Sequence, residues 1–188
     1  MIDRLCDQAG RKDIAVVGLY CDFLSHQEQS TTNVLGAILK QLSRRGEIPK
    51  DIREAFQKAR EEFGGRGLQL SDLVEIMKKV IASLSGVFIC IDALDESTPQ
   101  HRQELLQSLQ EIVRGSRNTR IFLTGRPHIE DEIMGSFGKV VKIPLSPTRD
   151  DIESYLEMKL SRDTDPYAMD DGLRADIMRV IPEKTSKM

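Results

Sequence analysis

The sequence predicts an α/β fold in which a parallel sheet is covered by helices, and three observations carry this prediction. Short apolar runs rich in β-branched residues occur at residues 14–20, 87–91, 119–123 and 139–145, and such continuous runs are typical of strands buried on both faces. Segments with a helical apolar stripe lie between them, and strands that alternate with helices form parallel sheets. The chain has 188 residues, of which 39% are hydrophobic, which is enough for one domain with its own core.

The first strand is followed by a polar loop and then by predicted helices. Ser30, Thr31 and Thr32 are candidate N-caps for the first helix, because short hydroxyl side chains accept hydrogen bonds from the free backbone N–H groups of a first turn. Its apolar residues share one face at helical spacing: Val34, Leu35, Ile38, Leu39 and Leu42. A second helix is expected from Pro49, and the GGRG sequence at 64–67 is interpreted as a turn.

A third helix precedes the second strand, and further helices follow the later strands. Ser71 or Asp72 is expected to cap the third helix. Its predicted apolar stripe consists of Leu73, Ile76, Met77, Val80, Ile81 and Leu84, and that of the helix after the second strand consists of Leu105, Leu106, Leu109, Ile112 and Val113. Pro99 begins and Gly115 ends a helix after the second strand, since proline suits a first turn and glycine a helix end. A turn and a short helix are predicted over 126–138.

Two helices are expected in the last quarter of the chain. Thr148 is the expected cap of the first, and the second, weaker one begins near Asp170. The apolar face predicted for the first of them consists of Ile152, Tyr155, Leu156 and Leu160.

Composition and charge narrow the class of protein. The formal net charge is -3 and Trp is absent, so neither bulk charge nor a base-stacking platform indicates a nucleic-acid partner. The cysteines Cys6, Cys21 and Cys90 are odd in number and form no CxxC pair, which favours a reducing, cytoplasmic location and argues against a zinc site. No apolar run approaches the length needed to span a membrane, so no membrane partner is expected.

Three acids follow the second predicted strand, in the sequence GVFICIDALDES at 86–97. Asp92 comes directly after the apolar run, and Asp95 and Glu96 follow it. In phosphate-transfer enzymes an Asp at such a strand end holds Mg²⁺, and a second carboxylate there orients or activates the attacking water. The alternative is that these acids cap the helix that begins near Pro99.

A second group of candidate residues follows the next strand, in IFLTGRP. Thr124 ends this strand and Arg126 comes two residues later, where a guanidinium could reach a γ-phosphate or the water bound to Mg²⁺. The alternative is an ordinary ion pair between Arg126 and a surface acid. Because the carboxyl ends of parallel strands share one edge of the sheet, both groups are expected at the same place.

The chain resembles NACHT domains, which belong to the STAND class of signalling NTPases. The resemblance is carried by VFICIDALDES, TRIFLTGRPHIEDEI and KIPLSPTRDDIESYLEMKL, with weaker support from residues 16–42, and it is similar in particular to fungal NACHT proteins with ankyrin or WD repeats. DALDE is its most specific motif. The resemblance implies a three-layer P-loop NTPase-like sheet flanked by helices. It also implies Mg²⁺ with ATP or GTP as cofactors, and appended repeat and effector domains as partners.

The resemblance also implies roles for the acids and the arginine. Asp92 would be the Walker B metal ligand, with Thr124 beside the nucleotide. Asp95 and Glu96 would be the added acids of the NACHT variant, and Arg126 would be the sensor-1 arginine.

The phosphate loop of such enzymes, GxxxxGK[ST], does not occur in the sequence. The resemblance places Met1 just after the expected loop, so we expect an N-terminally incomplete fold. Residues 1–160 would form a partial nucleotide-binding domain, and 161–188 would begin the following helical region.

Three functions are therefore open. The first is a fragment of a NACHT-type signalling NTPase with weak or no hydrolysis of its own, and with no nucleotide bound as the extreme case. The second is a non-catalytic interaction module that associates with itself or with intact NACHT proteins. The third is an independent metal-dependent enzyme at Asp92.

Overall fold

The computed structural model describes residues 14–25, 28–43, 69–162 and 170–185, together with Leu5, Glu54 and Gln57. The chain divides into two compact units, Met1–Val140 and Val141–Met188. The turn expected at 64–67 lies outside the described residues, and so does most of the helix expected from Pro49.

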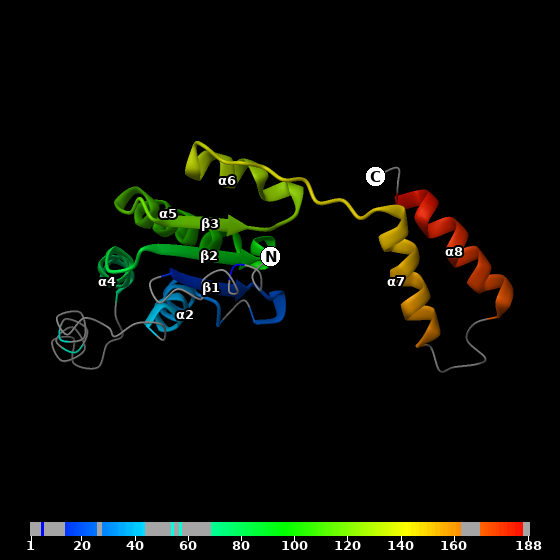
Figure 1. Cartoon of the computed structure of the whole chain (residues 1–188), viewed down its shortest axis with the longest axis horizontal. Helices are drawn as coiled ribbons and strands as arrows, with labels where there is room; N and C mark the ends of the chain where they lie inside the picture. Colours follow the sequence, from blue (N-terminus) through cyan, green and yellow to red (C-terminus); the bar gives the residue numbers. More distant parts are fainter. Residues whose placement is uncertain are drawn as a thin grey trace. The chain divides into compact units, whose positions relative to one another are not determined.

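The first unit contains a parallel sheet of three strands in the order β1-β2-β3 (Figure 1). The strands are β1 (Ile14–Tyr20), β2 (Gly86–Asp92) and β3 (Thr119–Leu123). Val17 lies beside Ile89, and Ile89 lies beside Ile121. Helices flank the sheet, so the α/β class and the parallel sheet are confirmed.

Four helices of the first unit are described: α2 (Thr31–Ser43), α4 (Leu70–Ala82), α5 (Pro99–Gly115) and α6 (Glu130–Phe137). Short 3₁₀ turns follow the strands at η1 (Phe23–Ser25), η2 (Leu94–Glu96) and η3 (Pro127–Ile129). The order of these elements matches the expected alternation of strands and helices. The predicted caps match in part. The backbone N–H of Asn33 in the first turn of α2 donates to the Ser30 hydroxyl at 3.3 Å, whereas the cap of α4 is Gln69, with Asp72 in the first turn rather than at the cap.

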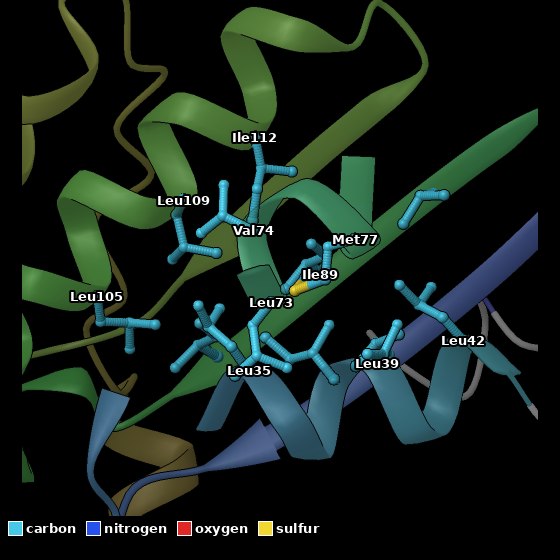
Figure 2. Close-up of a cluster of buried hydrophobic side chains, with 14 of the residues drawn as sticks. Leu35, Leu39, Leu42, Leu73, Val74, Met77, Ile89, Leu105, Leu109 and Ile112 are labelled. Carbon is cyan, nitrogen blue, oxygen red and sulfur yellow. The ribbon is translucent and has the colours of Figure 1, made fainter. Parts of the chain in front are cut away.

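The core lies between one face of the sheet and α2, α4 and α5 (Figure 2). Ile89 of β2, Met77 of α4 and Leu109 of α5 all belong to this cluster. The predicted stripes supply most of this cluster, which includes Leu35, Ile38, Leu39, Leu42, Leu73, Ile76, Val80, Ile81, Leu105, Leu106 and Ile112. The opposite face of the sheet carries Phe88 and Phe122, whose rings stack with centroids 6.3 Å apart.

The strand predicted over 139–145 is not formed, and this prediction was wrong. Residues 140–148 contain no helix or strand, and the side chains of Val141, Ile143 and Leu145 are 88%, 72% and 84% exposed. β-branched residues favour a strand only where a neighbouring strand supplies hydrogen bonds and packing. Among the described residues, no strand is paired with these positions.

The second unit contains the helices α7 (Arg149–Ser161) and α8 (Asp171–Thr185). Thr148 caps α7 as predicted, because its side chain accepts from the backbone of Asp151. Of the predicted apolar face only Leu156 is buried, and Tyr155 is largely exposed. Among the helices that the structure describes, none combines the length and apolar character that a membrane span requires.

Candidate functional site

The carboxyl ends of the three strands are tied together by backbone hydrogen bonds. The N–H of Cys21, just after β1, donates to the Asp92 carbonyl at 2.9 Å. The N–H of Thr124, just after β3, donates to the Ile91 carbonyl at 3.0 Å, and the N–H of Leu94 donates to the Thr124 carbonyl at 2.9 Å. The segments that carry the predicted site residues therefore hold a fixed relation to one another.

Asp92 and Thr124 meet side chain to side chain across the ends of β2 and β3. The Thr124 hydroxyl donates to Asp92 Oδ1, and the same oxygen accepts from the N–H of Ala93 at 3.1 Å. Thr124 Oγ1 also accepts from the Ala93 N–H at 3.0 Å. Ala93 adopts a left-handed conformation, with φ 54° and ψ 45°, which is uncommon for a residue with a Cβ. The chain thus turns sharply after Asp92, and this carboxylate stays exposed at the strand end.

Arg126 spans the two remaining acids. Its Nε lies 3.4 Å from Asp95 Oδ2, and its Nη2 lies 3.3 Å from Glu96 Oε1. The Arg126 backbone N–H also donates to Asp95 Oδ1 at 3.2 Å. The Asp95 side chain is only 5% exposed whereas that of Arg126 is 72% exposed. Asp95 therefore fixes the turn after β3, and the guanidinium stays at the surface.

Gly125 allows this turn to lie against the core. A Cβ at this position would lie 2.6 Å from Cδ1 of Ile129 and 3.4 Å from Asp95 Oδ1. Ile129 is fully buried, so it cannot move aside without disturbing its neighbours. The glycine in TGRP is thus explained by a close approach of side chains.

Cys21 is a buried thiol beside the acidic strand end, and sequence reasoning did not assign it to the site. Burial raises its pKa. A hydrogen bond with Ser97 partly offsets this rise, and the nearby charges of Asp92, Asp95 and Glu96 add to it. The thiol therefore stays protonated at neutral pH. Its position directly after the first apolar run was the available signal.

Arg102 is the second residue that sequence reasoning missed. Its guanidinium is buried and donates to both carboxylate oxygens of Glu132 and to the Ser97 carbonyl. Arg102 lies three residues before Leu105 on the apolar stripe of α5, so a charged residue at a core-facing position was a signal in the sequence. It connects the turn after β2 to α6.

Asp92 is the residue at the strand end that could hold a magnesium ion, because carboxylate oxygens are hard ligands of the kind that Mg²⁺ prefers. Thr124 bonds to one of its two oxygens. Asp95 is already engaged by Arg126, since its Oδ1 accepts from the backbone N–H and its Oδ2 forms an ion pair with Nε. Among the described residues no group of three His, Cys, Asp or Glu side chains is arranged to hold a metal ion. The remaining ligands would have to be water and phosphate oxygens.

All five residues predicted for the site lie together at the carboxyl ends of the strands. Asp92 contacts Thr124, and Asp95 and Glu96 contact Arg126. The alternative, in which Arg126 forms an ordinary ion pair, agrees with its contacts to Asp95 and Glu96. Both of these acids, however, belong to the predicted site. The acids do not cap α5, whose cap is Thr98.

The family model described as "Nephrocystin 3, N-terminal" matches residues 1–126. The match includes all of β1, β2 and β3 and ends at Arg126. No curated protein matches the chain.

Proposed function

Since the chain belongs to the family described as Nephrocystin 3, N-terminal, we propose that it is the acidic half of the nucleotide site of a NACHT-type signalling NTPase. In this proposal the chain contacts the magnesium ion and the terminal phosphates of ATP or GTP. It hydrolyses them weakly or not at all, because it has no phosphate loop motif of its own.

The observation that carries the proposal is the joint placement of Asp92 and Thr124 at the ends of neighbouring parallel strands. Ligands of open α/β sheets bind at the carboxyl ends of strands. Both hydrogen bonds to the Asp92 carboxylate go to Oδ1. Oδ2 accepts none from the described residues, so it is available to a cation. The resemblance to NACHT domains, with DALDE as its most specific motif, adds support.

Each residue has a distinct role in this proposal. Asp92 binds the ion, and Thr124 orients the Asp92 carboxylate. Arg126 lies at the surface, and its guanidinium contacts the terminal phosphate after it has separated from the two acids. Asp95 positions the turn that carries Arg126. Glu96 then orients water. When bound, the magnesium ion would neutralise phosphate charge and polarise the phosphoryl group.

Weak binding follows from the charges at the strand end. Three carboxylates face an anionic ligand, and Arg126 is already paired with two of them. Backbone N–H groups and the lysine of a phosphate loop supply most phosphate contacts in P-loop enzymes. Without them the triphosphate is held mainly through its metal ion.

Manganese binding tests the proposal directly, with free Mn²⁺ measured by its electron paramagnetic resonance signal. We expect the protein to take up Mn²⁺ in the presence of ATP or GTP and to take up much less without them. Asp92→Asn should weaken this uptake at least about tenfold, which equals ~1.4 kcal/mol. Asp131→Asn is the matched control because Asp131 is an exposed acid on α6 outside the site.

Three results would contradict the proposal. They are a complete absence of nucleotide-dependent uptake, equal uptake by Asp92→Asn and the wild type, and rapid phosphate release by this chain alone. The last result would instead favour an independent metal-dependent enzyme.

A second candidate function is a non-catalytic module that associates with intact NACHT proteins. It is favoured by the outer edge of β3, which no strand pairs with among the described residues. Co-purification with a full-length NACHT protein tests it. The complex should form equally well with Asp92→Asn, because this function does not use the metal ligand, and a complex lost in that variant would count against it.

A further inference from the structure

The two outer edges of the sheet, formed by β1 and β3, differ in the hydrogen bonds that their backbone groups make to the described residues. The outer edge of β1 is capped by side-chain amides. Gln41 Nε2 donates to the Gly18 carbonyl at 3.0 Å, and the Gly18 N–H donates to Gln41 Oε1 at 3.2 Å. Gln29 Nε2 donates to the Tyr20 carbonyl at 3.4 Å. These bonds replace those of a neighbouring strand, and capping of this kind keeps an edge from pairing with another chain.

The outer edge of β3 carries no such caps among the described residues. The bonds from Val87 N–H to the Asn118 carbonyl and from Thr124 N–H to the Ile91 carbonyl show which residues of β3 face β2. Because backbone groups alternate along a strand, the N–H and C=O groups of Ile121 and Leu123 point away from β2. Both residues are half-buried and pack against the core with their side chains.

The same chain offers a segment with the properties of a missing strand. Val141, Ile143 and Leu145 are exposed and alternate with Val140, Lys142 and Pro144. In an extended conformation the first three side chains would share one face, and their N–H and C=O groups would share one edge. The other edge would carry Pro144, which has no N–H, and proline is tolerated in a sheet at such an outer edge.

We infer that the 141–145 segment of one copy of this chain adds to β3 of a second copy as an antiparallel strand. In an antiparallel ladder, residues that exchange hydrogen bonds lie directly opposite and point to the same face. Val141, Ile143 and Leu145 can then bond to the β3 edge while their side chains extend the apolar face of Ile121 and Leu123.

A parallel arrangement fits less well, and this argues for a second copy. With the same side chains on the core face, a parallel strand would bond through Val140, Lys142 and Pro144, and the proline would leave one ladder position without a donor. A strand joined to β3 of its own chain through a crossover helix is parallel. Reciprocal exchange between two copies gives two equal contacts and a closed dimer.

Sedimentation velocity over a wide range of protein concentrations tests the inference with two proline variants. Ile143→Pro removes an N–H that faces β3, and we expect it to raise the dimer dissociation constant at least about tenfold. Lys142→Pro is the matched control, because its N–H faces away, and it should leave the constant within about twofold. Both positions lie outside the helices, strands and buried core, and circular dichroism verifies that the fold is retained.

Hydrogen exchange identifies the surface that is used. On dimerisation we expect slower exchange at both 119–124 and 140–145 in the wild type and no slowing in Ile143→Pro. A wild-type protein that stays monomeric overturns the inference, and so does equal weakening by the two prolines or protection elsewhere than at these segments. The inference does not depend on nucleotide binding, so Asp92→Asn should dimerise as the wild type does.

Discussion

The guanidinium of Arg102 and the carboxylate of Glu132 form a two-pronged ion pair between α5 and α6. Nε lies 2.7 Å from Oε2 and Nη2 lies 2.8 Å from Oε1. A third donor, Nη1, reaches the Ser97 carbonyl at 3.0 Å. The side chain of Arg102 is 6% exposed and that of Glu132 is 42% exposed. The buried Arg102 guanidinium therefore depends on this ion pair more than the Glu132 carboxylate does, because water can reach the carboxylate.

Removal of the more exposed partner is predicted to cost more stability. Glu132→Ala leaves a buried guanidinium with one acceptor, and it should lower the free energy of unfolding by roughly 2 kcal/mol, less than a fully buried pair would lose. Arg102→Met keeps the aliphatic packing and leaves a carboxylate that water can reach, so its cost should be about 1 kcal/mol. Urea unfolding measures both values.

A double-variant cycle checks this interpretation. Arg102→Met combined with Glu132→Ala should cost less than the sum of the two single changes, because the charge left unpaired by one is removed by the other. Glu75→Ala serves as the control and should leave stability unchanged. Glu75 is an exposed partner of Lys78, and Lys78 keeps its second partner Glu111 when Glu75 is removed. Additive single changes would contradict the coupling.

The same pair gives a pH dependence with a definite sign. The hydrogen bond and charge of Arg102 lower the pKa of Glu132 from its ordinary value of 4.5. A lowered pKa in the folded state adds stability above the unfolded pKa, and this stability is lost as the pH falls through the folded value. The stability advantage of the wild type over Glu132→Gln should therefore be full above about pH 4.5 and shrink below it. Unfolding free energies of both proteins at several pH values test this, and an advantage that grows on acidification would contradict it.

Gly125→Ala is predicted to destabilise the protein through a clash with one side chain. The added Cβ would lie 2.6 Å from Cδ1 of Ile129, and overpacking of this kind costs about 1–3 kcal/mol. Ile129→Val removes that methyl group, so the alanine should cost less in the valine background. Gly135→Ala in α6 is the control, because nothing lies within 4 Å of its Cβ, and it should be neutral or stabilising by up to about 1 kcal/mol. Equal losses at the two glycines would show that contact with Ile129 is not the cause.

Ala93→Gly is predicted to stabilise the turn after Asp92. Ala93 has φ 54°, and a left-handed conformation costs an L-residue about 1–2 kcal/mol. Glycine relieves this cost but loses more entropy on folding, so the net gain should be up to about 1 kcal/mol. Ala82→Gly in the last turn of α4 should instead lower stability, by about 0.5–1 kcal/mol. Thermal unfolding of the two variants should therefore shift in opposite directions.

Periodicity accounts for most of what the sequence predicted correctly. The stripes of α2, α4 and α5 gave the core residues, because a helix that packs on a sheet must bury one face. The shared position of parallel strand ends predicted that Asp92 and Thr124 lie close together, since each follows an apolar run directly. The position of Arg102 on the α5 stripe was equally visible, but its partner Glu132 was not, because pairing between helices depends on packing that the sequence pattern does not specify.

Where prediction failed, the deciding interactions are between segments distant in the sequence. The 139–145 run has strand-like residues, yet it forms no strand, because pairing needs a neighbour and β-propensity alone does not supply one. The sequence by itself determined the α/β class, the apolar faces of α2, α4 and α5 and the acids at the strand end, because these follow from local spacing. Only the tertiary structure decided that Asp95 holds the Arg126 turn, that Gly125 lies against Ile129 and that, among the described residues, side chains cap the outer edge of β1 but not that of β3. Those outcomes depend on which side chains meet in the folded chain.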